Sequence, residues 1–193
     1  MHEFRITAAT DLPTRYGVFK FESFRFESID PPHLALSMNL ASQKTPLVRV
    51  HSECMSGDVF GSVKCDCGDQ LQDAMDRISQ IGCGLVLYLR QEGRGIGIEK
   101  KIQAYALQEA GLDTVDANLA LGLPVDARSY DPAIAYLRYA GIRRCLLLTN
   151  NPEKVAALCD DGIDTQREPL LSSDHDACRD YLETKRLRMG HEC

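Results

Sequence analysis

The chain has 193 residues, of which 44% are hydrophobic and 26% are charged, with a formal net charge of -6. This length suits one domain, or one large domain with an appendage, and the hydrophobic fraction is sufficient for a core. The acidic balance argues against a nucleic-acid partner or a membrane-surface partner, because such binders carry a basic face. It still allows a small anionic substrate held by a few local Arg and Lys residues.

The amino-terminal sequence bears on the cellular compartment in which the protein is expected. It has no apolar stretch of the kind found in signal peptides, and no apolar run in the chain reaches membrane-spanning length. We therefore expect a cytoplasmic protein without a membrane partner. In a reducing compartment, free thiols and metal thiolates are more common than disulfides.

The first fifty residues carry strand signals. Residues 4–16 predict a strand and a turn, and residues 18–29 predict a half-buried hairpin or a bent strand with alternating phenylalanines. Residues 34–40 keep an apolar period of two, which indicates another strand. Residues 47–50 predict a short strand that leads into a loop rich in cysteine and glycine.

The remaining sequence alternates between helix and strand patterns. In chain order it predicts a helix over 69–82, a strand over 84–89, a helix over 98–111, an ordered loop over 113–130, a helix over 131–141, a strand over 145–148 and a helix after Asn151. The helix after Gly97 carries Ile98, Ile102, Tyr105 and Ala106 on one side. We expect an α/β fold with three αβα layers and a mixed sheet whose N-terminal strands are antiparallel. Residues 1–173 would form a single catalytic domain, and residues 174–193 a polar tail or terminal helix.

Three cysteines, Cys54, Cys65 and Cys67, fall within fourteen residues of polar, glycine-rich sequence. Thiolates at this spacing suit zinc, and three ligands without a fourth are typical of a catalytic zinc that keeps one position for water. The alternative is that these cysteines are packing residues, and on a strand a Cys-x-Cys pair would point to opposite faces. His51 could serve as a fourth ligand, contact substrate or simply pack.

Two turns that connect a strand to a helix are candidates for an anion site, because ligands of α/β sheets bind at such places. Residues 90–97 contain three glycines and two arginines, but their spacing matches neither a P-loop nor a dinucleotide fingerprint. In residues 149–154, the free backbone N–H groups of a helix start and the charge of Lys154 could together bind an anion. The alternative for residues 90–97 is a flexible loop without a ligand, and the alternative for residues 149–154 is an ordinary helix start. With a water-activating metal, the two turns indicate hydrolysis of a phosphorylated small molecule.

Several motifs occur together in one order and resemble the GTP cyclohydrolase II family over about residues 45–167. They are RVHSEC, CDCG, RQEGRGIG, AYALQ, DTVDAN, the Asp126-x-Arg128 pair and LLTNNPEK. The resemblance implies hydrolysis of GTP with release of formate and pyrophosphate to give 2,5-diamino-6-(5-phosphoribosylamino)pyrimidin-4(3H)-one, the first step of riboflavin biosynthesis. It also implies a homodimer, one Zn²⁺ per subunit and Mg²⁺ on the triphosphate.

The resemblance assigns roles to individual positions of this sequence. The zinc ligands would be Cys54, Cys65 and Cys67. Catalysis would involve Asp126 as proton acceptor, Arg128 as nucleophile on the α-phosphate and Tyr105 during ring opening. The implied substrate-binding residues are Arg49, Val50, His51, Ser52, Glu53, Gln70, Glu92, Gly93, Arg94, Thr114, Thr149 and Lys154.

Arginine is an unusual nucleophile, because its pKa exceeds about 12 and its lone pairs are delocalised. We therefore expect Arg128 to stabilise charge on the phosphate that is cleaved, and we keep the covalent role as the alternative. Ser129 departs from the family pattern and leaves room for a paralogue with the same ring-opening chemistry in another pathway. A non-catalytic zinc-stabilised module is a further alternative, but it would have no need of Tyr105, Asp126 and Arg128.

Overall fold

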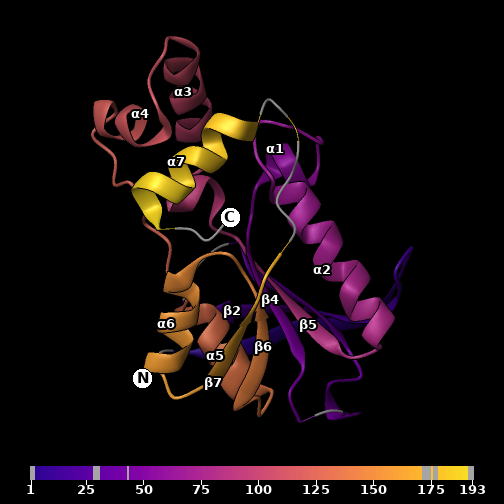
Figure 1. Ribbon diagram of the computed structural model, residues 1–193. Coiled ribbons are helices and arrows are strands. Elements are labelled where there is room, and N and C mark those ends of the chain that lie inside the picture. The colour runs from indigo at the N-terminus through magenta and orange to yellow at the C-terminus, as the bar shows by residue number, and fades with distance from the viewer. Residues whose placement is uncertain (1–2, 28–30, 43, 171–174, 176–177, 191–193) are drawn as a thin grey trace. The chain divides into compact units, whose positions relative to one another are not determined.

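The computed structural model describes residues 3–27, 31–42, 44–170, 175 and 178–190 (Figure 1). In chain order the elements, with η for 3₁₀ helices, are β1 (Phe4–Thr14), β2 (Gly17–Phe26), β3 (His33–Met38), η1 (Leu40–Ser42), β4 (Leu47–Ser52), α1 (Met55–Asp58), α2 (Cys67–Ile81), β5 (Gly84–Leu89), η2 (Glu92–Gly95), α3 (Ile98–Glu109), α4 (Thr114–Ala120), α5 (Asp131–Tyr139), β6 (Arg144–Leu148), α6 (Pro152–Asp160), β7 (Asp164–Glu168) and α7 (Arg179–Met189).

These elements form two compact units, each built from segments distant in sequence. The first unit takes in Met1–His51, Leu71–Arg90 and Tyr130–Leu170, and the second takes in Ser52–Gln70, Gln91–Ser129 and Leu171–Cys193. The division of the chain into a catalytic domain of residues 1–173 and a tail of residues 174–193 stays a prediction.

A seven-stranded sheet forms the centre of the first unit, in the order β1-β2-β3-β5-β4-β6-β7. The pairs β1–β2, β2–β3 and β3–β5 are antiparallel, whereas β4–β6 and β6–β7 are parallel. The sheet is therefore mixed, and its N-terminal strands are antiparallel. This confirms the predicted α/β fold class.

Helices cover both faces of this sheet. Leu85 and Leu87 of β5 pack in an apolar cluster with residues of α5 and α6, such as Leu137 and Leu158, while Val86 packs in a second cluster with residues of α2, such as Ile78. Successive residues of a strand face opposite sides. Helices α5 and α6 therefore lie on one face and α2 on the other, which gives the predicted three layers (Figure 1).

Two elements differ from the sequence-based expectation. Residues 113–130 are not loop throughout, because α4 forms there with the Asp113 side chain accepting a hydrogen bond from the backbone N–H of Asp116 at 2.8 Å. Strand β7 was not predicted, because its sequence DTQRE has no apolar alternation. It is the outermost strand beside β6, and an edge strand needs fewer apolar side chains than a central one.

Helix α7 falls within residues 174–193, for which a polar tail or a terminal helix was expected, whereas residues 171–174, 176–177 and 191–193 lie outside the described part. Among the helices formed by described residues, none combines the length and the apolar character that a membrane crossing requires.

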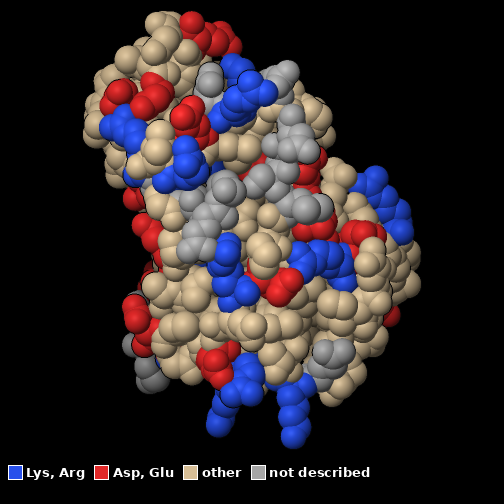
Figure 2. Space-filling view, in the orientation of Figure 1, with Lys and Arg blue, Asp and Glu red and all other residues tan. Residues whose placement is uncertain are grey.

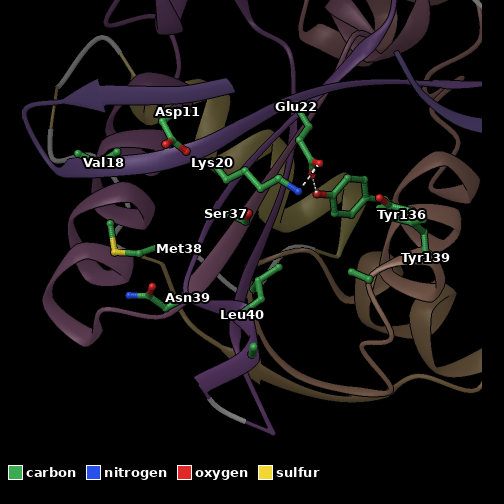
Figure 3. A pocket seen from close by; sticks show the side chains of 12 residues that line it. Asp11, Val18, Lys20, Glu22, Ser37, Met38, Asn39, Leu40, Tyr136 and Tyr139 are labelled. Atoms are coloured by element: carbon green, nitrogen blue, oxygen red, sulfur yellow. Dashed lines mark hydrogen bonds and ion pairs between the residues drawn. The ribbon is translucent and has the colours of Figure 1, made fainter. Parts of the chain in front are cut away.

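A cavity of about 790 Å³ in the first unit lies between the β1–β2 hairpin, the end of β3 and α5 (Figure 3). Glu22 is 3% exposed, and its carboxylate accepts a hydrogen bond from the Tyr136 hydroxyl at 2.5 Å and pairs with Lys20 Nζ at 2.6 Å. Burial, together with the Glu22 carboxylate, raises the pKa of Tyr136 above its ordinary value. The buried carboxylate is tolerated because both of its oxygen atoms have partners.

Replacing Tyr136 by Phe removes the hydroxyl that satisfies Glu22 while keeping the ring. We expect the free energy of unfolding to fall by about 1.5–3 kcal/mol, since the buried Glu22 carboxylate loses one of its hydrogen-bond donors. Urea unfolding measures this change. Tyr139→Phe is the matched control, because Tyr139 lines the same cavity but is 56% exposed, and it should change stability by less than about 0.5 kcal/mol. Equal stability of the two variants would contradict this account.

Candidate active site

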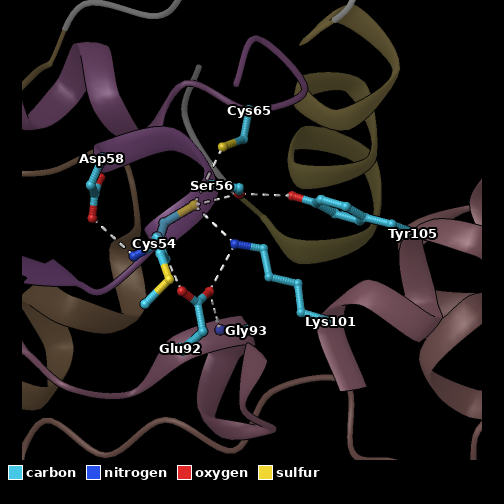
Figure 4. A network of polar contacts seen from close by, with 9 residues as sticks. Cys54, Ser56, Asp58, Cys65, Glu92, Gly93, Lys101 and Tyr105 are labelled. Carbon is cyan, nitrogen blue, oxygen red and sulfur yellow. Dashed lines mark hydrogen bonds and ion pairs between the residues drawn. The ribbon is translucent and has the colours of Figure 1, made fainter. Parts of the chain in front are cut away.

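The three clustered cysteines come together in the second unit. Cys54 precedes α1, Cys65 lies in a turn, and Cys67 is the first residue of α2. Their sulfur atoms all lie within 4.8 Å of one another. The sulfur atoms of Cys54 and Cys65 are 3.6 Å apart (Figure 4). Because neither Cys65 nor Cys67 is on a strand, the Cys-x-Cys pair does not direct its sulfurs to opposite faces, and the predicted convergence is confirmed.

Two glycines allow the loop to close this tightly. A Cβ atom on Gly68 would lie 2.6 Å from the carbonyl oxygen of Gly57, and a Cβ atom on Gly57 would lie 3.2 Å from the Cys65 sulfur. The first distance is shorter than any tolerable contact with backbone. The start of α2 can therefore approach α1 only because Gly68 lacks a side chain, and Gly57 gives the Cys65 sulfur further room.

The three sulfurs fit the requirements of zinc. In a tetrahedral zinc site with Zn–S bonds of about 2.3 Å, two ligand sulfurs are about 3.8 Å apart, close to the separation of the Cys54 and Cys65 sulfurs. Cys54 and Cys65 are buried and Cys67 is half-buried. The structure thus offers three soft donors at suitable spacing.

A buried lysine lies against this cluster, as Figure 4 shows. The ammonium group of Lys101 donates to the Cys54 sulfur at 3.1 Å and to Glu92 Oε1 at 2.8 Å. The other carboxylate oxygen of Glu92 accepts from the backbone N–H of Met55 at 2.6 Å. These contacts join α3, η2 and α1 around the Cys54 sulfur.

The electrostatics favour a thiolate at Cys54. Hydrogen bonds from Cys65 and Cys67 hold the pKa of Cys54 far below its usual range, and the Lys101 ammonium group adds to this effect. The hydrogen bond with Cys54 raises the pKa of Cys65 to about 11. Burial alone would lower the pKa of Lys101, but the Cys54 thiolate and Glu92 outweigh it and hold that pKa above its ordinary value.

Tyr105 of α3 is connected to the cysteine cluster by one intermediate side chain, that of Ser56. Its hydroxyl is 3.5 Å from Ser56 Oγ, which is itself 3.5 Å from the Cys54 sulfur. The Lys64 ammonium group lies 5.1 Å from the centre of the Tyr105 ring. Burial raises the pKa of the Tyr105 phenol, so the phenol keeps its proton at neutral pH.

The glycine-rich turn of residues 90–97 contains the 3₁₀ helix η2 at its centre. Gly93 and Arg94 both have φ of 60°, and for Arg94 this left-handed backbone is costly. The Arg94 carbonyl accepts from the Ala127 backbone N–H at 3.0 Å. Within the described part of the chain, the buried Nη1 atom of Arg94 has no hydrogen-bond partner. A strained backbone and an unsatisfied buried donor are features of a ligand-binding position.

Asp126 and Arg128 form a close pair next to this turn. Arg128 Nε donates to both carboxylate oxygens of Asp126, at 2.9 and 3.0 Å, and Nη2 makes a further short contact. Burial alone would raise the pKa of Asp126, but the Arg128 guanidinium outweighs it and lowers that pKa. Asp126 is therefore ionised at neutral pH and is a weaker base than a free carboxylate.

The other predicted site residues of the second unit lie on its loops and helix starts. The Ser52 hydroxyl accepts from the Gln91 amide at 2.8 Å. The buried Gln70 amide donates to Asp66 at 2.6 Å. Thr114 is the first residue of α4, and Glu53 is half-buried just before Cys54.

The remaining predicted residues form a group in the first unit, along β4 and at the end of β6. Arg49 Nη1 donates to the Leu148 carbonyl at 3.0 Å, and Arg49 Nη2 is 3.3 Å from His51 Nδ1. The His51 ring stacks on Tyr88 with centres 5.4 Å apart, which agrees with the packing role considered for it. The Val50 carbonyl accepts from Lys154 Nζ at 2.8 Å.

The turn after β6 begins a helix as predicted. Asn151 caps α6 by accepting from the Glu153 backbone N–H at 2.9 Å, and Pro152 is the first helical residue. The Thr149 hydroxyl accepts from the Asn151 backbone N–H at 3.0 Å. Lys154 is only 5% exposed, so its charge is held close to this turn rather than in solvent.

Sequence reasoning missed Lys101. The predicted apolar side of its helix is not the buried one, because Ile98 and Ile102 are exposed whereas Lys101 and Ala104 are buried. A hydropathy pattern places lysine on the solvent side by default. The available signal was the position of Lys101 in the first turn of the helix that follows the glycine-rich turn.

Comparison with known proteins identifies the family to which this chain belongs. The sequence profile of GTP cyclohydrolase II matches residues 5–169. A GTP cyclohydrolase-2 of Acinetobacter baumannii is 50% identical over 187 residues, which cover 95% of this chain and 94% of that protein. GTP cyclohydrolase-2 proteins of Neisseria gonorrhoeae and Acinetobacter baylyi are 50% and 49% identical, with the same coverage. The resemblance seen in the motifs is confirmed: the chain is an enzyme and belongs to the GTP cyclohydrolase II family.

Proposed function

We propose that this chain hydrolyses GTP, opening its imidazole ring with release of formate and pyrophosphate to give 2,5-diamino-6-(5-phosphoribosylamino)pyrimidin-4(3H)-one. This is the first step of riboflavin biosynthesis. The observation that carries the proposal is the convergence of three cysteine sulfurs at zinc-like spacing in a member of this family. We further propose a cytoplasmic homodimer with one zinc per subunit and Mg²⁺ on the triphosphate.

Cys54, Cys65 and Cys67 would hold the zinc. When bound by three protein ligands, zinc supplies a water whose pKa is lowered to about 7, so that hydroxide is available near neutral pH. Lys101 would offset the negative charge of the thiolates by its hydrogen bond to the Cys54 sulfur. Such contacts to a ligand atom tune a metal site.

Tyr105 would supply a proton during ring opening. Its raised pKa keeps the hydroxyl protonated, and it is linked to the Cys54 sulfur through Ser56. A neutral phenol can give a proton to a ring nitrogen as the carbon–nitrogen bond breaks. The charged Lys101 lies 5.7 Å from the centre of the Tyr105 ring and would stabilise a phenolate once the proton has left.

Arg128 would stabilise charge on the phosphate that is cleaved. Asp126 supports this role, because its carboxylate contacts Arg128 through both oxygen atoms and fixes the guanidinium plane. The lowered pKa of Asp126 makes it a better orienting group than proton acceptor. Arg94, with a buried donor that has no partner among the described residues, would add a second positive contact to substrate.

The other substrate contacts are proposed from the family positions. They would be made by Arg49, Val50, His51, Ser52, Glu53, Gln70, Glu92, Gly93, Thr114, Thr149 and Lys154.

Incubation of the purified protein with GTP tests the proposal. We expect formate, pyrophosphate and the ultraviolet absorbance of a diaminopyrimidine to appear together. Turnover of another purine nucleotide without turnover of GTP would overturn the proposed substrate. It would favour a paralogue that uses the same ring-opening chemistry in another pathway.

Cys65→Ser removes one of the three proposed zinc ligands. We expect bound zinc to fall from about one per chain to well below that, and formate release to fall at least about 100-fold, since the metal site loses a thiolate. Elemental analysis and a formate assay measure the two effects. Cys159→Ser, which changes an exposed thiol, is the control and should keep wild-type zinc content and formate release. A Cys65→Ser enzyme with full zinc content would contradict the proposed ligand set.

Arg128→Ala should slow pyrophosphate release by about 10²–10³-fold, because a positioned charge on the phosphate is lost. Arg128→Lys, which keeps the charge, should be markedly less impaired. Trapping a phosphoramidate on Arg128 would contradict the charge-stabilising role and support the covalent one.

Asp126→Asn should lower turnover without changing its pH dependence. The pKa of Asp126 is depressed by Arg128, so its ion pair is complete above the unfolded pKa of about 3.9 and is lost only as pH falls through the lower folded pKa. The deficit of Asp126→Asn relative to wild type should therefore be constant between about pH 6 and 8. A deficit that disappears at the acidic end of this range would indicate that Asp126 titrates there as a base.

A further inference from the structure

Helix α7 contacts the rest of the second unit through charged side chains, and its apolar residues Tyr181 and Leu182 are partly buried. Lys185 is its most deeply buried described side chain, at 7% exposed, whereas Leu187 is 66% exposed. The Lys185 ammonium group lies 4.5 Å from the centre of the Tyr181 ring on the same helix. A buried lysine is unusual unless it has a partner of opposite charge.

The partner of Lys185 lies inside the cysteine motif. Lys185 Nζ contacts Asp66 Oδ1 at 2.7 Å, and Asp66 is fully buried between Cys65 and Cys67 in the sequence. The second oxygen of Asp66 accepts from the Gln70 amide at 2.6 Å. Both oxygen atoms of the central residue of Cys-x-Cys are therefore fixed, one of them by the C-terminal helix.

A second contact of α7 lies at the surface and is weaker. Arg188 pairs with Asp113, and with Asp116 of α4 at 3.2 Å. Basic and acidic side chains adjoin in Figure 2 where Figure 1 places α7 and α4. Exposed ion pairs of this kind contribute little, so the buried Lys185–Asp66 pair is the stronger of these two contacts.

We propose that α7 is part of the metal centre, with Lys185 as a positioning residue that holds Cys65 and Cys67 in ligand geometry through Asp66. The proposal rests on the proposed zinc site. Because Asp66 separates the two cysteines, a rotation of its backbone would move both sulfurs. The Lys185 contact opposes such a rotation and neutralises a buried carboxylate beside three thiolates.

The arrangement has a thermodynamic consequence. If docking of α7 favours the ligand geometry, zinc binding must favour docking of α7 by the same factor. The metal and the C-terminal helix would then stabilise each other, although Lys185 lies 119 positions from Asp66 in the sequence.

Zinc affinity of Lys185→Met tests the inference, measured on the full chain by competition with a chromophoric chelator. We expect binding about tenfold weaker or more, since removal of partners beyond the ligands themselves typically costs 10–100-fold. Substitution by Co²⁺ should also show altered thiolate-to-cobalt absorption. Arg186→Met removes an exposed charge from the same helix and should leave affinity and spectrum unchanged.

Lys185→Met leaves the Asp66 charge buried without its lysine, so the fold must be checked by circular dichroism. The double variant Asp66→Asn/Lys185→Met removes both charges and separates the pair from general packing of α7. We expect it to recover much of the lost zinc affinity. A double variant as weak as Lys185→Met, or a Lys185→Met protein with wild-type zinc affinity, would overturn the role of Lys185.

A wild-type protein that binds no zinc would overturn both this inference and the proposed function. Wild-type zinc binding combined with an unaffected Lys185→Met protein would overturn the inference alone.

Tryptic cleavage within α7 tests the reciprocal effect, because the helix offers Arg179, Lys185, Arg186 and Arg188 as cleavage sites. Cleavage there should be several-fold faster in chelator-treated wild type than in the zinc-loaded protein. Equal rates would contradict the linkage between helix and metal.

Discussion

Three sulfur atoms within 4.8 Å of one another concentrate negative charge once they ionise, and much of the second unit is arranged to tolerate that charge. Lys101 contacts one of the sulfurs directly, and Lys185 neutralises the carboxylate between the other two. Two glycines let the segments approach closely enough for the sulfurs to meet. A divalent ion would offset much of the remaining negative charge, since it binds thiolates and neutralises them.

Hydrogen bonds also connect the cysteine cluster to the segments that we propose to be catalytic. Lys101 and Glu92 connect the Cys54 sulfur to η2, and the Arg94 carbonyl of η2 holds the backbone next to Asp126 and Arg128. A disturbance at the sulfurs would therefore reach the residues proposed to act on phosphate.

The sequence predicted those features that depend on local pattern. Alternating strands, the Asn151–Pro152 helix start and the cysteine spacing are local signals, and the structure confirms them. Strand β7 was missed because an edge strand needs little apolar pattern. The lysines at the cluster were missed for a different reason. Hydropathy assigns a lysine to solvent, and only a partner distant in the sequence, such as Asp66 for Lys185, makes its burial favourable.

X-ray absorption at the zinc edge of the purified enzyme tests the central claim most directly. The account predicts about one zinc per chain, with three sulfur neighbours at about 2.3 Å and one lighter neighbour from solvent. A fourth sulfur, a fourth protein ligand that persists when GTP is added, or fewer than three sulfurs would contradict it.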